Sequence, residues 1–266
     1  MGIYHTKLTD YGYKEKISRY RHTISYQEED NGHIPLPREK YENMDEWKKK
    51  KSDERRMQYY KRKTIELVEI ALMNPDLNTV ITLTFREPVT SYEYALAKWQ
   101  LFLKRLRHTF DFALKYICVW EYQRKRGQKE GMEHGGVFHF HALMNTGFLD
   151  HKKLEKIWGN GFVWIEKIPD TAQREKSIKY VTKYISKEIV YRIEHGEDVR
   201  GQRFFFTSNN LLKPTELLLE ERLNLEDMIM EHLEDMIKDG SYNIKDCTGK
   251  IINQVDYIEF KKQKGK

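Results

Sequence analysis

The segment Phe138-His139-Phe140-His141-Ala142-Leu143-Met144 begins with alternating apolar and polar residues, as expected for a β-strand. Successive side chains of a strand point to opposite faces, so both histidines lie on one face and the phenylalanines and Ala142 on the other. The phenylalanine face needs a packed core. We therefore expect an antiparallel sheet around this strand, covered by helices on the phenylalanine side.

Outward from this strand, short apolar strands and amphipathic helices recur between residues 76 and 214. Strands are predicted at 79–85, 115–123, 137–144 and 161–168, and helices after Ser91, at 151–158 and at 171–187. The order β-α-β-β-α-β followed by a helix is typical of ferredoxin-like and RNA-recognition-like α+β domains. One sheet face should remain open for a ligand, and 203–214 should add one more strand.

The segments on either side of residues 76–214 are expected to be mainly helical. Residues 1–75 would form a basic extension whose helix covers 43–73, with dense Lys and Arg at 48–63. This basic stretch would be either a DNA-contacting arm or a solvated helix face. Residues 215–266 would form an acidic amphipathic helix over 215–238 and a small hairpin over 242–260.

The composition indicates a soluble, cytoplasmic globular protein, since no apolar run reaches the length of a membrane span. Two cysteines, Cys118 and Cys247, exclude a disulfide framework or a cysteine-rich zinc site. Residues 76–214 hold 23 Lys and Arg against 16 Asp and Glu, which favours a polyanionic partner. No G-x-x-x-x-G-K-[ST] loop occurs, so we expect a separate helicase to unwind any duplex substrate.

The paired histidines indicate a metal site. Imidazole nitrogens with a carboxylate suit Mn²⁺, and also Mg²⁺ when phosphate oxygens add ligands. Glu121 is the candidate carboxylate, because it interrupts an apolar strand that can pair with the histidine strand, and a lone charge there would be unfavourable. The alternative is a surface hairpin that happens to carry two histidines. His134, in a glycine-flanked loop, is a weaker candidate ligand.

A second motif, YVTKYISK at 180–187, places Tyr180 and Tyr184 four residues apart on one helix face. A phenol activated next to a metal could attack a phosphodiester, which forms a phosphotyrosine and frees a 3′-hydroxyl. Lys183 and Lys187 could stabilise the phenolate or bind the phosphate. The alternative is an ordinary amphipathic helix with buried tyrosines and solvated lysines.

Basic residues near these motifs are candidate DNA contacts. The predicted phosphate-binding residues are Arg124, Lys125, Arg126 and Lys129 at the hairpin tip, with Lys152, Lys153 and Lys156. Trp120, Tyr122, Trp164 and residues 204–206 could stack unpaired bases, or could belong to the core.

The motifs together resemble those of a known family. FHFHAL at 138–143 resembles the His-hydrophobic-His motif of the HUH endonucleases, and TVITLTF at 79–85 resembles their first motif. The 180–187 helix is similar to the two-tyrosine helix of rolling-circle replication initiators from small single-stranded DNA phages and plasmids. The resemblance implies that Glu121 and the two histidines hold a divalent ion and that the tyrosines act by alternating strand transfers. Some plasmid relatives have a tyrosine only at the second of these two positions. If one tyrosine alone is catalytic, the resemblance therefore favours Tyr184.

The function implied is that of a metal-dependent nickase and strand transferase that starts rolling-circle replication on single-stranded or locally melted origin DNA. A mobilisation relaxase or a single-strand transposase would use the same chemistry. A different alternative is a non-enzymatic module that binds single-stranded nucleic acid on a ferredoxin-like sheet. That module would bind independently of metal and would release no cleavage product.

Overall fold

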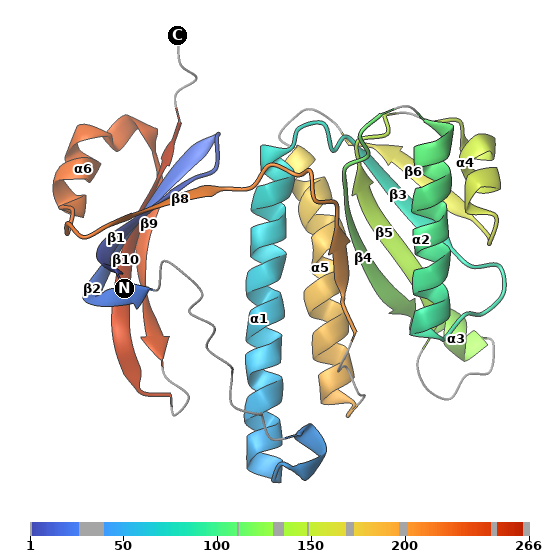
Figure 1. The fold of residues 1–266 in the computed structure, drawn as a ribbon, viewed down its shortest axis with the longest axis horizontal. Coiled ribbons are helices and arrows are strands. Elements are labelled where there is room, and N and C mark those ends of the chain that lie inside the picture. The colour runs from blue at the N-terminus through green and yellow to red at the C-terminus, as the bar shows by residue number, and fades with distance from the viewer. Residues whose placement is uncertain are drawn as a thin grey trace. The chain divides into compact units, whose positions relative to one another are not determined.

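The computed structural model describes residues 2–26, 40–110, 112–129, 136–147, 149–168, 173–196, 202–245 and 249–262. The chain divides into two compact units (Figure 1). One, the central unit, is Lys40–Leu212; the other, the terminal unit, combines Met1–Glu39 with Lys213–Lys266. Each unit contains a five-stranded antiparallel sheet, which confirms the α+β prediction. Among the described residues, no helix has the length and apolar character needed to cross a membrane.

The central unit has the predicted element order. After η1 (Tyr41–Asn43) and α1 (Glu46–Met73) come β3 (Thr79–Thr84), α2 (Tyr92–Thr109), β4 (Tyr116–Gln123), α3 (Arg124–Lys129), β5 (Val137–Met144), α4 (His151–Trp158), β6 (Val163–Lys167), α5 (Gln173–Glu194) and β7 (Phe205–Thr207). The strands lie in the order β6-β3-β5-β4-β7. The first four therefore make a split βαβ sheet, and β7 is the extra strand expected within 203–214. The short helix α3 lies in a segment expected to be a loop.

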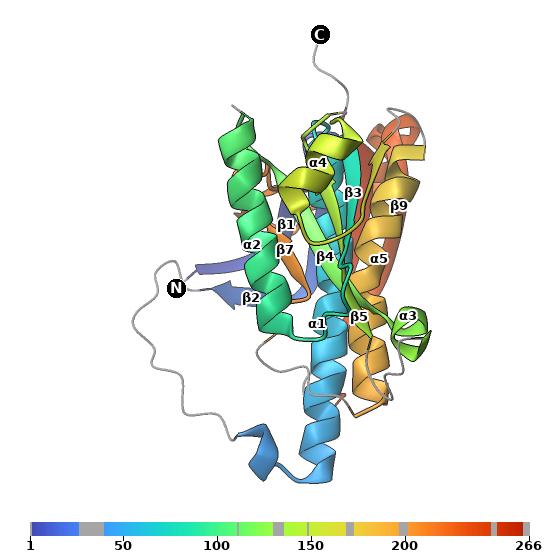
Figure 2. The same cartoon turned by 90° about the vertical axis from the view of Figure 1, so that its right-hand side faces the viewer.

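Helices cover both faces of the central sheet (Figure 2). On the phenylalanine face, Trp99 of α2 stacks on Phe140 at 5.5 Å between ring centroids, and Trp158 of α4 packs against the same ring. On the histidine face α5 lies against β4 and β5, and α1 packs on α5. The expectation of an open face is therefore wrong for this half of the sheet. The face stays exposed at β6, where Trp164 keeps 66% of its surface accessible.

Local capping explains where the helices of the central unit start. Asp45, Ser91 and Asp150 precede α1, α2 and α4, and each side chain accepts a hydrogen bond from a first-turn backbone N–H. Ser91 was the expected cap of its helix. Gly159 ends α4 with φ of 66°, a left-handed conformation that glycine adopts without strain. These signals fix where three helices of the central unit begin and where α4 ends.

The terminal unit differs from the expected helical extensions. Its strands are β1 (Gly2–Asp10), β2 (Lys14–Tyr26), β8 (Thr215–Leu219), β9 (Met236–Lys245) and β10 (Ile251–Lys261), in the order β8-β1-β2-β10-β9. The acidic helix expected over 215–238 is replaced by β8, α6 (Leu225–Glu231), η2 (Leu233–Asp235) and the start of β9. The hairpin expected over 242–260 is present as β9 and β10. Strands form here because the two ends of the chain pair with each other: β1 pairs with β8, and β2 pairs with β10.

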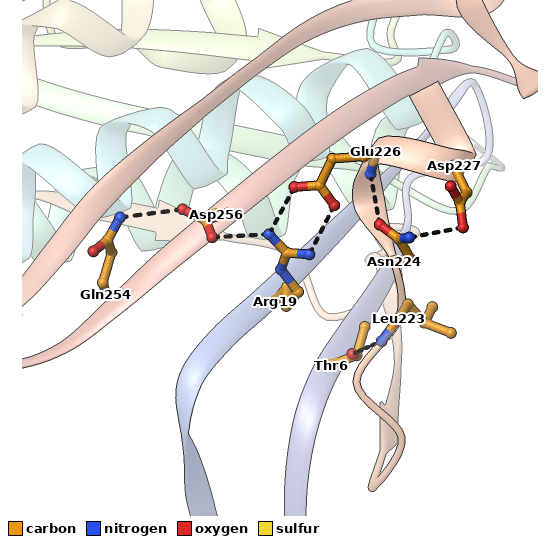
Figure 3. A network of polar contacts seen from close by, with 8 residues as sticks. All are labelled: Thr6, Arg19, Leu223, Asn224, Glu226, Asp227, Gln254 and Asp256. Atoms are coloured by element: carbon orange, nitrogen blue, oxygen red, sulfur yellow. Dashed lines mark hydrogen bonds and ion pairs between the residues drawn. The ribbon is translucent and has the colours of Figure 1, made fainter. Parts of the chain in front are cut away.

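An ionic network holds α6 on this terminal sheet (Figure 3). The Arg19 guanidinium on β2 donates to both Glu226 oxygens, at 3.1 and 3.3 Å, and to Asp256 on β10 at 3.2 Å. Asn224 caps α6 by accepting from the Glu226 backbone N–H. Beneath the network, Leu225 joins a small core with Ile17 and Ile258. Glu226, an acidic residue of the segment expected to be one long helix, thus binds Arg19 on a strand of the same unit.

Candidate metal and nucleic-acid site

The candidate metal ligands lie side by side on the β4–β5 hairpin. Glu121 of β4 is directly opposite His139 of β5, as the sequence predicted. His141 follows two positions later on the same face, and the two imidazole centroids are 4.7 Å apart. Both histidines are buried beneath α5, with 7% and 5% of their surfaces exposed. Burial of two polar rings on one strand requires partners for their nitrogens.

Potential ligand atoms of Glu121, His139 and His141 all lie within 4.8 Å of one another. The His141 Nε2 is 3.4 Å from the Glu121 Oε1. The Nδ1 atoms point to other groups: that of His139 is 3.0 Å from the Gln123 amide and that of His141 is 3.1 Å from the Thr82 hydroxyl. These contacts fix both rings with Nε2 directed at the carboxylate side.

The residues present fit a divalent cation. The Nε2 of His139 is buried and has no hydrogen-bond partner among the described residues. Burial, helped by the neighbouring His141, lowers the pKa of His139 to about 3, so the ring is neutral and can act as a ligand near neutral pH. A metal-bound Nε2 leaves the proton on Nδ1. The Gln123 amide, whose nitrogen faces Nδ1, would then turn over so that its oxygen accepts the hydrogen bond from Nδ1–H. Two imidazoles and a carboxylate suit Mn²⁺ or Mg²⁺ completed by other oxygens.

The two tyrosines of α5 lie over this site in different environments. The Tyr184 ring stacks on the His141 imidazole, with centroids 4.2 Å apart and planes 4° apart, and only 7% of the residue is exposed. Burial first, and then a hydrogen bond with Tyr180 and the Glu121 charge, raise the pKa of Tyr184. Tyr180 packs edge-on against Tyr184 and keeps 52% of its surface exposed. Tyr180 is therefore the accessible phenol.

A cavity of about 510 Å³ joins Tyr180 to the histidines. It opens between α5 and the exposed part of the sheet at β3 and β6. Its lining consists of Val80, Thr82, His139, His141, Trp164, Glu166, Lys167, Ile168, Lys176, Ser177 and Tyr180. The structure thus brings one phenol, both imidazoles and one exposed indole to a single hollow.

The lysines of the tyrosine motif are directed at the same site. The Lys183 Nζ lies 3.9 Å from the centroid of the Tyr180 ring and 5.2 Å from that of Tyr184. The Lys187 Nζ lies 3.5 Å from the Glu121 Oε2 and 5.5 Å from the centroid of the Tyr184 ring. Lys183 thus lies against the two tyrosine rings, whereas Lys187 forms an ion pair with Glu121, the candidate metal-binding carboxylate.

The predicted DNA-contact residues divide into three groups. Lys125 and Lys129 are exposed and line a second cavity, of about 580 Å³, next to Glu121. Arg124 and Arg126 line the same cavity, but their guanidinium groups already bind protein groups. The third group is Lys152, Lys153 and Lys156 of α4, which are exposed. Since α4 packs on the phenylalanine face, this group lies on the other side of the sheet from the histidines.

Two supporting contacts at this site were not predicted from the sequence. Glu188 on α5 is 1% exposed and makes a bidentate ion pair with Arg124, at 2.8 and 2.9 Å, and Arg124 also lies over the Tyr191 ring. This pair joins the tyrosine helix to the end of the strand that carries Glu121. Its only sequence signal is that Glu188 follows Tyr184 by four residues, on the same helix face.

The aromatic residues predicted to stack on bases differ in their exposure to solvent. Trp120 and Phe204 stack on each other in the core at 5.0 Å, whereas Trp164 faces the cavity and is exposed. Tyr122 packs on Phe138. His134 lies outside the described residues.

Residues 78–189 match the model of the family described as Replication-associated protein ORF2/G2P. The matched span runs from the start of β3 into α5 and includes Glu121, both histidines and both tyrosines. Searches of the curated proteins and of the solved structures gave no match. The family match covers less than half of the chain and supports a role as a replication-associated protein.

Proposed function

We propose that this chain starts rolling-circle replication by cutting one strand of origin DNA and joining the new 5′ end to a tyrosine. The family match supports the replication role. The observation that carries the chemistry is the unpartnered Nε2 of His139, buried beside His141 and Glu121 and beneath the helix of the two tyrosines.

Glu121, His139 and His141 would hold a divalent cation, Mg²⁺ or Mn²⁺. When bound, such a cation withdraws charge from the non-bridging oxygens of a phosphate and so favours nucleophilic attack. Gln123 and Thr82 orient the two imidazoles through their Nδ1 atoms. Lys187 balances the charge of Glu121 when the carboxylate has no other partner.

Tyr180 is the proposed nucleophile of the first cut. Its phenolic oxygen loses a proton and forms a bond to phosphorus, and the bond from phosphorus to the 3′-oxygen breaks. The products are a 5′-phosphotyrosine and a 3′-oxygen that takes up a proton. The Lys183 ammonium, 3.9 Å from the centroid of the Tyr180 ring, can stabilise negative charge on the phenol.

Tyr184 is the proposed acceptor in the second strand transfer. Its stacking on His141 keeps it buried in the structure described here, so it must leave this stack before it attacks. Two phenols one helical turn apart can then exchange a DNA end without a long movement of the chain. The order Tyr180 then Tyr184 follows from their exposure.

The experiment uses a single-stranded origin oligonucleotide, with Mn²⁺ or Mg²⁺, and denaturing gels. We expect a protein–DNA adduct that survives denaturation, requires the cation and disappears in the Tyr180→Phe/Tyr184→Phe variant. An adduct that persists in this variant would contradict the proposal. Cation-independent binding without any cleavage product would instead favour a non-enzymatic single-strand-binding module.

A further inference from the structure

The net charge of the chain is concentrated in residues 46–63, the first 18 of the 28 residues of α1. Residues 46–63 contain nine Lys and Arg against three Asp and Glu, a net charge of +6, which equals the formal charge of the 266-residue protein. The net charge of all the other residues is therefore zero. A balanced, solvated surface does not require such a concentration, and like charges one turn apart destabilise an isolated helix.

The first 14 of these 18 residues do not contribute to the core of the central unit. The buried residues of α1 begin at Tyr60 and continue through Leu67 and Ala71, where the helix packs on α5. Residues 46–59 include no buried residue, and Trp47 is 64% exposed. Figures 1 and 2 show this end of α1 extending past the end of α5. These 14 residues extend about 21 Å at 1.5 Å per residue, and residues 46–63 as a whole are called the arm below.

The cations of this arm surround the helix instead of forming one stripe. At 100° per residue, Lys49, Lys50 and Arg55 point in three directions that are about 100° or more apart. An α-helix about 10–12 Å across fits the major groove of DNA, which is about 12 Å wide and has phosphates on both walls. A single strand offers phosphates along one line only. A membrane surface requires an apolar helix face, which this segment lacks.

We infer that residues 46–63 form a DNA-binding arm that takes duplex DNA through its backbone phosphates. The choice of DNA as partner rests on the proposed replication function. In that function the arm would hold duplex DNA at the Glu194 end of α5, and the locally melted strand would enter the cavity at Tyr180, about 21 Å away along this helix. The arm and the cavity are then two separate binding surfaces of one unit. The arm binds duplex DNA, and the cavity binds single-stranded DNA.

The test compares two full-length variants that each lose four positive charges. The arm variant is Lys50→Gln/Arg55→Gln/Lys61→Gln/Arg62→Gln, which changes exposed residues only and keeps good helix formers. The matched control is Arg21→Gln/Lys104→Gln/Lys213→Gln/Lys245→Gln, which changes four exposed residues with no proposed role in DNA binding. The probes are a labelled duplex of about 25 base pairs of arbitrary sequence and the corresponding single strand, in EDTA, between about 50 and 200 mM NaCl.

The arm variant should bind the duplex at least about tenfold more weakly, and the slope of log K against log salt should fall by about 3 to 4. The control should change neither value by a comparable amount, and the arm variant should form covalent adducts on single-stranded DNA as the wild type does. Equal losses in both variants, equal losses on both probes, or wild-type duplex binding would overturn the inference. Binding of the arm to anionic phospholipid vesicles but not to duplex would also overturn it. Failure of the wild type to form an adduct bears on the proposed function and leaves the duplex measurement interpretable.

Discussion

The Tyr184 ring lies flat on the imidazole of His141, with 4.2 Å between the ring centroids and 4° between the planes. This contact joins the tyrosine helix to the strand that supplies the candidate metal ligands. It also removes Tyr184 from solvent, while Tyr180, one turn earlier, remains exposed beside the same cavity. The two phenols are therefore not equivalent.

Single substitutions should separate the two tyrosines. Tyr180→Phe should lower the rate of the first covalent adduct by about 10³-fold or more, since it removes the accessible nucleophile. Tyr184→Phe retains the ring that stacks on His141, so the first adduct should form at a near-normal rate. Quenched-flow assays on a single-stranded origin oligonucleotide measure both rates. The reverse pattern would show that the buried phenol attacks first.

Substitution of the metal ligands should abolish cation binding. Mn²⁺ at 100 times its Kd should stabilise the wild type by about 2.7 kcal/mol, because only the folded chain presents the three ligands together. His139→Ala and Glu121→Gln should lose this stabilisation, as measured by thermal unfolding with and without Mn²⁺. His151→Ala, which removes a histidine of α4 outside the ligand group, is the control. Unchanged stabilisation in His139→Ala would place the cation elsewhere.

Trp164 should bind an unpaired base beside the active site. It is in register with Thr82, which is in register with His141, so the indole lies two strands, about 10 Å, from that histidine. Trp164→Ala should weaken binding of single-stranded DNA by about 1–3 kcal/mol, measured by fluorescence anisotropy in EDTA. Phe162→Ala is the matched control, since Phe162 is 72% exposed but does not line the cavity. Equal effects of the two changes would count against a stacking site.

The ion pair between Arg124 and Glu188 should contribute to stability more than a surface pair does. Arg124→Met would leave the buried Glu188 carboxylate without its main partner and should lower the free energy of unfolding by about 3–5 kcal/mol. Burial already raises the pKa of Glu188, against the effect of Arg124. The double variant Arg124→Met/Glu188→Leu should recover much of the loss, as urea unfolding can measure. No recovery would mean that Arg124 acts through its contact with Tyr191 or another group.

Local sequence patterns were sufficient to predict the central sheet and its candidate site. The alternation around His139 fixes which side chains share a face, and the hairpin places Glu121 opposite His139. Both relationships depend only on strand periodicity and on residues close in sequence. The caps and the spacing of the tyrosines are local features of the same kind.

The unpredicted features depend on contacts between distant residues. The β1 strand pairs with β8 across more than 200 residues, so neither end of the chain shows its partner in its own sequence. The covering of the histidine face by α5 is also a matter of packing, since the helix alone does not indicate which surface it meets. Likewise, the sequence around Arg124 does not show that its guanidinium binds Glu188 on α5.

The most direct test of the account is to identify the amino acid that carries the DNA. Trypsin cuts after Lys179, Lys183 and Lys187, so Tyr180 and Tyr184 fall in separate peptides, 180–183 and 184–187. After a single turnover with Mn²⁺ and a short single-stranded origin oligonucleotide, nuclease and trypsin digestion leaves a nucleotide tag on the peptide. Because YVTK (180–183) and YISK (184–187) have the same mass, tandem mass spectrometry identifies the tagged peptide from its fragment ions. The account predicts a tag on peptide 180–183 that is absent when EDTA replaces Mn²⁺. A tag on peptide 184–187 alone, a tag on neither peptide, or one that forms equally well in EDTA would contradict this prediction.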